Sequence, residues 1–319
     1  MVTVEKTPEF ASRRIKGDSV LKATVAAAAL AIIALLVALA YELVSGSGPS
    51  ISKFGLSFVW ITTWDPVHQI FGALPFIYGT IVTSILALLF GLPISIGVAI
   101  FLTEKLKARR GLGQLVGTLI ELLAAVPSVI YGLWGLFFLS PLLKKYVETP
   151  LHHYLGFFPL FSGTPFGLDF FTAGIILAIM IIPTVSAISR NVLNAVPNSQ
   201  REAMFSLGAT DWEVTWKSIL PYARSGIFGA SILGLGRAVG ETMAVTMVIG
   251  NEVKISPSLF SGGYTLSAVI ANEFTEATGA LYISSLIEIG LALFVLALVI
   301  NVFARLLLWR MTKGIRFRV

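Results

Sequence analysis

Two ionisable side chains lie inside a long apolar segment in the C-terminal third of the chain. Arg237 and Glu241 are four residues apart, so on one helix they would share a face and pair. A charge at a bilayer centre costs about 2.5–3.5 kcal/mol on an insertion scale, so both should point into a bundle or a wet cavity. A guanidinium offers a planar fork of donors that fits oxyanion oxygens two at a time. The pair therefore predicts an anion path, and a buried ion pair that only fixes helix register is the alternative.

Glycines and one further acid accompany this pair. Gly236 and Gly240 have the small-x-x-x-small spacing that lets another backbone approach closely. Glu121, in an earlier apolar segment, is expected to pair with Arg237 or to line the cytoplasmic half of the path. A hydrogen bond to a neighbouring helix is an equal alternative for Glu121. Together, Arg237, Glu241, Gly236, Gly240 and Glu121 form the candidate substrate pathway.

A polar segment at about 198–219 predicts a short helix, a glycine turn and a second helix. Ser199 and Glu202 have the spacing of a capping box, and so do Thr210 and Glu213. Gly208 is the residue that most cheaply ends the first helix in a left-handed conformation. A helix lying on the membrane, or a linker packed on its own bundle, is the plainer reading of this segment.

The elements that must position these residues are transmembrane helices. The chain has 319 residues, 56% of them apolar and 13% charged, which is too apolar for a water-soluble globular domain. Apolar runs of about 20 residues favour helices, and alternating ten-residue segments of a barrel are absent. The sequence thus predicts an all-α integral membrane protein of about six spans. The expected spans are Ala23–Val44, Leu74–Leu102, Gln114–Ser140, Phe170–Ser189, Tyr222–Gly250 and Tyr282–Arg305.

Lysine and arginine placement predicts the orientation. These residues concentrate in the N-terminal tail, in the second and fourth connections and at the C-terminal end, which favours cytoplasmic termini. We expect a cytoplasmic tail at 1–22, one transmembrane domain at 23–311 and a cytoplasmic tail at 312–319. A signal peptide is the alternative for the N-terminus, but its apolar run is longer than a typical signal core.

Several chemistries are disfavoured by residue counts. The chain has no cysteine, and its three histidines include the neighbours His152 and His153, which a solvated or packed loop explains better than a metal site. No Gly-Lys dipeptide is present, so a phosphate-binding Walker loop is absent and a partner must hydrolyse any ATP. We expect no cofactor or metal on this chain, no catalytic residue and no nucleic-acid partner.

The cytoplasmic segment resembles a known family. The run Glu202-Ala203-Met204, then Gly208, then Leu220-Pro221 is similar to the EAA loop of ABC importer permeases, with Met204 and Ser218 departing from the usual pattern. The resemblance implies the type I permease fold and a coupling helix that docks on an ATPase subunit. Glu202, Ala203, Met204, Gly208, Leu220 and Pro221 would then be the coupling residues.

A second resemblance concerns the substrate. The segment 235–245 around Arg237, the segment 121–128 and the segment 177–183 look like phosphate ABC permeases. Residues 53–56, Trp64-Asp65 and 72–74 favour the PstC-type subunit over the PstA-type sister. The resemblance implies a PstA-type permease, a PstB-type ATPase dimer using ATP and Mg, and a PstS-type phosphate-binding protein outside the inner membrane. Alternatives are another oxyanion such as sulfate, molybdate or phosphonate, a stand-alone proton-coupled transporter, or a membrane-embedded enzyme at His152, His153 and Asp169.

Overall fold

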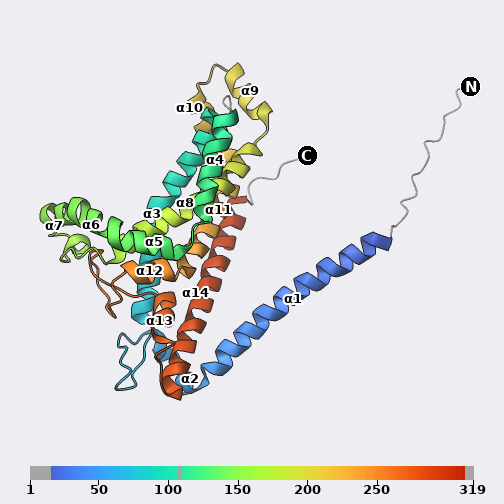
Figure 1. The fold of residues 1–319 in the computed structure, drawn as a ribbon. Coiled ribbons are helices and arrows are strands. Elements are labelled where there is room, and N and C mark those ends of the chain that lie inside the picture. The colour runs from blue at the N-terminus through green and yellow to red at the C-terminus, as the bar shows by residue number, and fades with distance from the viewer. Residues whose placement is uncertain (1–15, 107–109, 313–319) are drawn as a thin grey trace, which may run out of the picture. The chain divides into compact units, whose positions relative to one another are not determined.

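The computed structural model describes residues 16–106 and 110–312, and all of its regular elements are helical (Figure 1). The chain divides into two compact units, residues 1–45 and 46–319, and α1 is the described part of the first. Residues 313–319 of the predicted C-terminal tail and residues 1–15 lie outside the described residues, whereas residue 312 belongs to α14 and residues 16–22 belong to α1. The helices are α1 (Lys16–Gly46), α2 (Gly48–Phe54), α3 (Leu74–Ile100), α4 (Arg110–Ala124), α5 (Ser128–Trp134), α6 (Ser140–Leu143), α7 (Thr149–Leu155), α8 (Phe170–Asn194), α9 (Asn198–Ser206), α10 (Asp211–Val214), α11 (Leu220–Gly240), α12 (Met243–Val248), α13 (Leu266–Glu273) and α14 (Ala280–Thr312).

Short 3-10 and π-helical turns join several of these helices. The 3-10 turns are η1 (Gly55–Val59) and η5 (Pro159–Phe161), and the π-helical turns are η2 (Phe101–Lys105), η3 (Gly135–Leu139), η4 (Lys144–Glu148) and η6 (Thr215–Ile219). Two of the π turns matter for the site, because η2 prolongs α3 and η6 joins α10 to α11 without a break.

Four single helices of the described chain are long and apolar enough to cross a membrane. They are Asp18–Gly46, Leu74–Lys105, Phe170–Asn194 and Ala280–Arg310, and they correspond to four of the expected spans. A fifth candidate is the pair Gly111–Ala124 and Ser128–Leu155, which is bent by 90°. Of the expected spans, four are thus confirmed as single helices, and a fifth corresponds to the bent pair.

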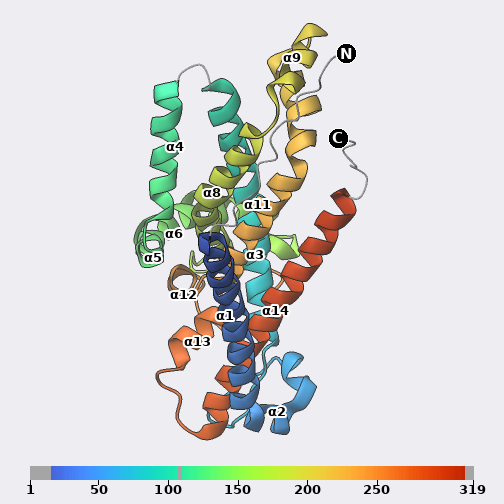
Figure 2. The ribbon, with the colours of Figure 1, turned by 90° about the vertical axis from the view of Figure 1, so that its right-hand side faces the viewer.

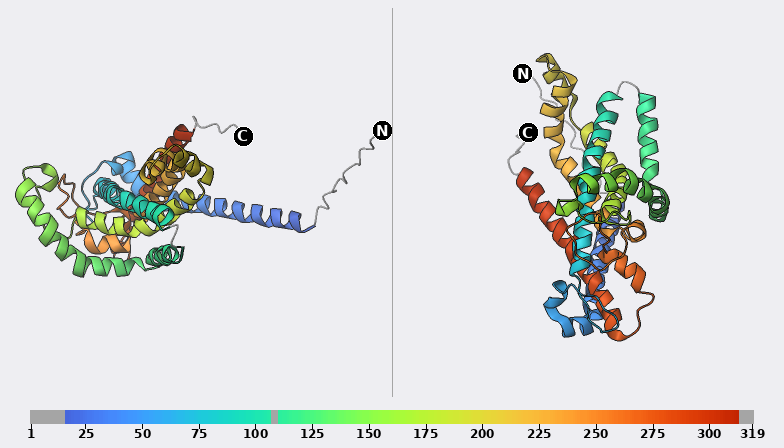
Figure 3. Two further views of the ribbon diagram at one scale, coloured as in Figure 1. Left: turned by 90° about the horizontal axis from the view of Figure 1, so that it is seen from above. Right: turned by 90° about the vertical axis from the view of Figure 1, so that its left-hand side faces the viewer.

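The other two expected spans are not single straight helices. In the predicted span Gln114–Ser140, α4 ends at Ala124 and Pro127 opens α5, because proline lacks the N–H that the preceding turn needs. From α5 to α7 the chain then runs across the bundle and curves along one side of it (Figures 1 and 3). In the predicted span Tyr222–Gly250, α11 ends at Gly240 and a separate short helix, α12, follows.

Helix α8 forms the centre of the second unit. In Figure 2 it lies between α4 and α11, and α3 packs along it. Glycines permit this close packing: a Cβ on Gly91 of α3 would come within 2.8 Å of Ile181, and one on Gly234 of α11 within 2.5 Å of Val185. Aliphatic side chains of these helices fill the core between them.

An aromatic cluster holds the α2 end of the unit together. Trp64 packs edge-on against Phe71 and Phe76, and Phe71 stacks on Tyr282 of α14. The Trp64 indole also donates a 2.7 Å hydrogen bond to Glu273. These contacts bury Trp64 in a packed core.

Candidate functional site

Arg237 lies in the last turn of α11 and faces α8. Its side chain is half-buried, and Nη1 donates a 2.9 Å hydrogen bond to Oγ1 of Thr184. Thr184 directly follows Pro183, which lies inside α8. The described residues give Arg237 no carboxylate partner, so its charge is met by one neutral hydroxyl.

Glu241 is not on the same helical face as Arg237, contrary to the expectation. The helix ends at Gly240, and Glu241 has extended backbone angles, with φ −70° and ψ 129°. Its Oε1 accepts a 3.3 Å hydrogen bond from the backbone N–H of Ala244, in the first turn of α12, and its carbonyl accepts one from Ser267 of α13. The carboxylate therefore lies at the junction of α11 with α12, near the arginine in sequence but not paired with it among the described residues.

The two glycines beside Arg237 face open space. A Cβ added to Gly236 or to Gly240 would meet nothing within 4 Å, and both residues are exposed. The close approach to α8 occurs instead at Gly226 and Gly234, where a Cβ would collide with Val192 and Val185. The expected small-residue contact at Gly236 and Gly240 is thus not made within this chain.

Glu121 pairs with a different arginine from the one expected. Nη1 of Arg190, on α8, lies 3.4 Å from Oε1 of Glu121, on α4. Gly117 makes room for this arginine, since a Cβ there would lie 2.4 Å from Nη1. Arg190 follows Thr184 by six residues on α8, about 9 Å along the helix axis.

The predicted helix, turn and helix at 198–219 is present, with one correction. Ser199 does not cap α9, because the helix begins one residue earlier at Asn198 and Pro197 precedes it without a side-chain cap. Gly208 adopts φ +80°, as the expected helix end requires. Thr210 and Glu213 form the complete predicted capping box, and Pro221 lies in the first turn of α11. Hydrogen bonds from Lys217 and then from Thr210 lower the pKa of Glu213 to about 2.

The expected coupling residues divide between surface and core. Glu202, Ala203, Gly208 and Pro221 are exposed, whereas Met204 and Leu220 pack against a buried cluster that includes Leu193 and Ile219. A groove of about 560 Å³ lies beside them, between the end of α3 and the α9, α10 and η6 segment. Two exposed tryptophans of that groove, Trp212 and Trp216, have ring centroids 5.2 Å apart. This end of the unit presents an apolar, aromatic surface of the kind that binds a protein partner.

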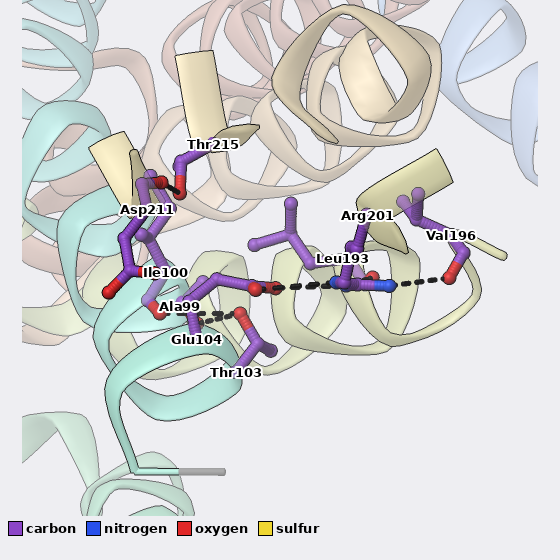
Figure 4. A network of polar contacts seen from close by, with 9 residues as sticks. All are labelled: Ala99, Ile100, Thr103, Glu104, Leu193, Val196, Arg201, Asp211 and Thr215. Atoms are coloured by element: carbon purple, nitrogen blue, oxygen red, sulfur yellow. Dashed lines mark hydrogen bonds and ion pairs between the residues drawn. The ribbon is translucent and has the colours of Figure 1, made fainter. Parts of the chain in front are cut away.

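Sequence analysis missed the most connected polar residue at this end. The guanidinium of Arg201 is buried and points between the end of α3 and the last turn of α8 (Figure 4). It donates to both carboxylate oxygens of Glu104, at 3.3 and 2.9 Å, and to the carbonyls of Val196 and Leu193, at 2.7 and 3.2 Å. Its position directly before Glu202 in the EAA-like run was the available signal.

A buried pair of carboxyl groups was missed as well. Glu148 and Asp169 are both fully buried and lie against each other, and Thr172 hydrogen-bonds to both of them. Each has one oxygen, Oε2 of Glu148 and Oδ2 of Asp169, without a hydrogen-bond partner in the described chain. Burial raises the pKa of Asp169 to about 6.

The described residues contain no cluster of three or more potential metal-ligating side chains. His152 instead places Nδ1 3.0 Å from the carbonyl of Phe161, a contact that joins α7 to η5.

Comparisons with known proteins place the chain in a family. Residues 91–313 match the family described as "Binding-protein-dependent transport system inner membrane component". The phosphate transport system permease protein PstC of Pasteurella multocida is 49% identical over 89% of each chain. The PstC protein of Mesorhizobium japonicum is 48% identical over 92% of this chain and 90% of the relative.

Solved structures agree at the level of fold. A bacterial alginate ABC transporter, solved in complex with an alginate pentasaccharide-bound periplasmic protein, superposes with a TM-score of 0.61 at 20% identity and covers 96% of this chain and 99% of its own. The MetNI methionine ABC transporter, in an inward-facing conformation, gives a TM-score of 0.52 at 18% identity over 73% of this chain and 91% of its own. The chain has the fold of an ABC importer permease and belongs to the family of binding-protein-dependent transport system inner membrane components.

Proposed function

We propose that this chain is the PstC-type permease subunit of an ATP-driven importer of inorganic phosphate and forms half of the translocation path. The observation that carries the proposal is the half-buried Arg237, whose recorded hydrogen bond goes to the neutral Thr184 hydroxyl. A guanidinium has five N–H donors, so most of them remain for an anion. The PstC proteins of Pasteurella multocida and Mesorhizobium japonicum, named as phosphate transport permeases, supply the substrate class.

In this proposal Arg237 binds the phosphate oxygens and Glu241 limits how long they stay. The end of α11 at Gly240 and the hydrogen bond of Glu241 to Ala244 support this role, because the carboxylate follows the arginine closely in sequence and the described residues show no direct ion pair between them. A nearby negative charge weakens the binding of an anion, and a transport site needs binding that is strong enough for entry and weak enough for release. A phosphate that still carries a proton also has an O–H to donate to Glu241.

Gly236, Gly240 and Glu121 are proposed to line the same path. The open space beside both glycines leaves room for the anion or for the sister permease to approach α11. Glu121 would act through Arg190, because the long 3.4 Å contact leaves that guanidinium available to an anion moving toward the cytoplasm.

The α9 to α11 segment is proposed to couple this path to a PstB-type ATPase dimer. Glu202, Ala203, Gly208 and Pro221 offer an exposed docking surface, and Met204 and Leu220 pack it against the buried cluster that includes Leu193 and Ile219. ATP and Mg would be bound by the ATPase, and the other partners would be a PstA-type permease and a PstS-type phosphate-binding protein.

The orientation follows from helix parity and charge. If α4 with its bent continuation and α11 with α12 each count as one crossing, the chain crosses six times and both termini lie on the same side. The positively charged connections, with α9 and α10 among them, then lie in the cytoplasm of an inner membrane, as lysine and arginine placement favours.

Phosphate uptake tests the proposal most directly. Cells that lack their own PstC-type subunit would carry this chain, and labelled phosphate uptake would be measured at low external phosphate with excess sulfate as competitor. We expect restored uptake that sulfate leaves unchanged. Uptake that sulfate, molybdate or phosphonate abolishes would assign another oxyanion, and uptake that persists without any ATPase subunit would favour a stand-alone transporter.

A further inference from the structure

Two connections leave the proposed ATPase-docking segment, and they differ in kind. The α10 end is continuous through η6 into α11, so motion of α10 reaches Arg237 along one unbroken helical path. The α9 end joins α8 through residues 195–197, where Pro197 has an extended ψ of 139°. A non-helical joint of this kind transmits motion poorly unless other contacts stiffen it.

Arg201 supplies those contacts. Two of its four hydrogen bonds go to the carbonyls of Leu193 and Val196, at and just beyond the last turn of α8. The usual α-helical donor to Leu193 would be Pro197, which has no N–H, and the Val196 N–H supplies a 3.3 Å contact to that carbonyl. A cation is also favourable at the negative end of a helix dipole. The other two bonds go to Glu104 on η2, and α3 packs along the length of α8. One side chain therefore ties α9 to both α8 and α3.

Burial makes this tie hard to replace. The side chains of Arg201 and Glu104 are 9% and 15% exposed, and removing one partner of a buried ion pair leaves the other charge uncompensated. Lysine keeps the charge of Arg201 but offers no planar fork, so it cannot serve both carboxylate oxygens and two carbonyls together.

We propose that Arg201 is the positioning residue through which motion of α9 reaches α8, so that ATPase motion acts on Thr184 as well as on Arg237. The two routes meet at the 2.9 Å hydrogen bond from Arg237 to Thr184, because α11 carries its donor and α8 its acceptor. Relative movement of α9 and α10 then breaks or remakes this bond, which changes how many donors Arg237 offers to an anion. The inference rests on the proposed function, since it requires an ATPase partner and an anion at Arg237.

The test measures coupling in the full complex of both permeases and the ATPase dimer in proteoliposomes with the phosphate-binding protein. Phosphate uptake and ATP hydrolysis are followed together for the unchanged complex, Arg201→Lys and Glu104→Gln. Residues in such networks typically change coupling by about 2- to 30-fold, so we expect phosphate moved per ATP to fall about tenfold in both variants. Asp211→Asn is the matched control, because it removes the neighbouring Lys105 ion pair, which joins η2 to α10 at the exposed surface and leaves the contacts of α9 with α8 intact.

A second readout separates the transmission of motion from α9 to α8 from a role of Arg201 in the stability of the fold alone. The chain has no cysteine, so Ala187→Cys, three residues after Thr184 on α8, gives one labelling site. Its labelling rate should differ between nucleotide-free and vanadate-trapped complexes, both in the otherwise unchanged chain and with Asp211→Asn. With Arg201→Lys the rate should be the same in the two states.

The outcomes are separable. If Arg201→Lys keeps the native ratio of phosphate to ATP and the native labelling change, the inference is wrong. It is also wrong if uptake and hydrolysis fall in parallel with subunit co-purification, since Arg201 would then serve assembly alone. Failure of the unchanged complex to transport phosphate would instead overturn the proposed function.

Discussion

At the scale of single residues, Arg237 stands out because a permanent charge is matched by one hydroxyl. If the guanidinium binds the anion, Arg237→Gln should remove charge-assisted hydrogen bonds worth about 1.5–3 kcal/mol, which is roughly a 10- to 150-fold loss in uptake at low phosphate. Arg237→Lys should retain part of the activity, because it keeps the charge but loses the fork. The measurement is the initial rate of phosphate uptake, normalised to the amount of chain in the membrane.

Arg224→Gln is the control for that experiment. Arg224 is on the same helix, two residues after Tyr222, and is exposed, so its removal changes the charge of α11 without touching Thr184. Equal losses in the two glutamine variants would point to a general charge effect and would remove Arg237 from the anion path.

Asp169 predicts a pH dependence of stability. Its pKa is raised by burial to about 6, so the folded state favours the protonated form, and this stabilisation is full below the unfolded value of about 3.9 and is lost as pH rises through about 6. Asp169→Asn keeps the acceptor that caps α8 and never ionises. The variant should melt at a higher temperature than the unchanged chain near pH 8, and the difference should shrink as the pH is lowered through about 6.

The neighbouring Glu148 provides the companion variant. It faces Asp169, so Glu148→Gln removes one of the two buried carboxyl groups. Like Asp169→Asn, it should make the melting temperature depend less on pH. If the melting-temperature difference between either variant and the unchanged chain stays constant across this pH range, the two carboxyl groups do not change their protonation on unfolding.

Residue types alone identified Arg237 but not its neighbours. An arginine in an apolar run is conspicuous, whereas Thr184, on a distant helix, carries no local signal for its hydrogen bond. Arg201 was overlooked because a basic residue in a polar connection is usually solvated, and only the tertiary packing of α3 and α8 buries it. The pairing of Glu121 with Arg190 instead of Arg237 likewise depends on which helices are neighbours.

At the scale of elements, the turn between α9 and α10 depends on two local features. Gly208 has φ +80°, a conformation that costs a residue with a Cβ about 1–2 kcal/mol, and Thr210 caps α10 in a box with Glu213. Loss of an N-cap side chain costs about 0.5–2 kcal/mol. Gly208→Ala and Thr210→Ala should therefore speed hydrogen exchange of the α10 amides and lower ATPase co-purification.

Ser199→Ala is the matched control for this pair. Ser199 has the sequence spacing of a cap but lies inside the first turn of α9, without a capping hydrogen bond. Its removal should leave exchange and co-purification unchanged, and an effect equal to that of Thr210→Ala would contradict the observed start of α9.

Broken helices mark the limit of prediction at this scale. Apolar composition continues through Pro127 and through Glu241, so both segments were predicted as single spans. Proline explains why the helix is interrupted near 127, but the 90° turn depends on packing beyond that residue. At 241 the chain leaves the helix where Glu241 and Ser267 provide alternative hydrogen bonds, which only the folded chain brings together.

At the scale of the whole molecule, the sequence predicts spans but not their order in space. All long spans have similar hydropathy, yet 67% of the apolar window of α8 is buried and only 17% of that of α14. The difference reflects position, since α3, α4 and α11 all pack against α8. Apolar surface left on the outer helices suits lipid or the sister permease, and both environments accept the same residues.

Orientation is the remaining whole-molecule property, and the absence of native cysteine makes it measurable. Val67 and Leu207 are matched in exposure, at 86% and 83%, but lie in connections that the proposed topology puts on opposite sides of the membrane. In intact cells that lack the ATPase subunit, an impermeant maleimide should label Val67→Cys and leave Leu207→Cys unlabelled, because only the first connection would face outward. After permeabilisation both should react at similar rates, as their equal exposure requires. Labelling of Leu207→Cys in intact cells would place α9 and α10 outside, and that orientation would rule out both ATPase docking and a coupling role for Arg201.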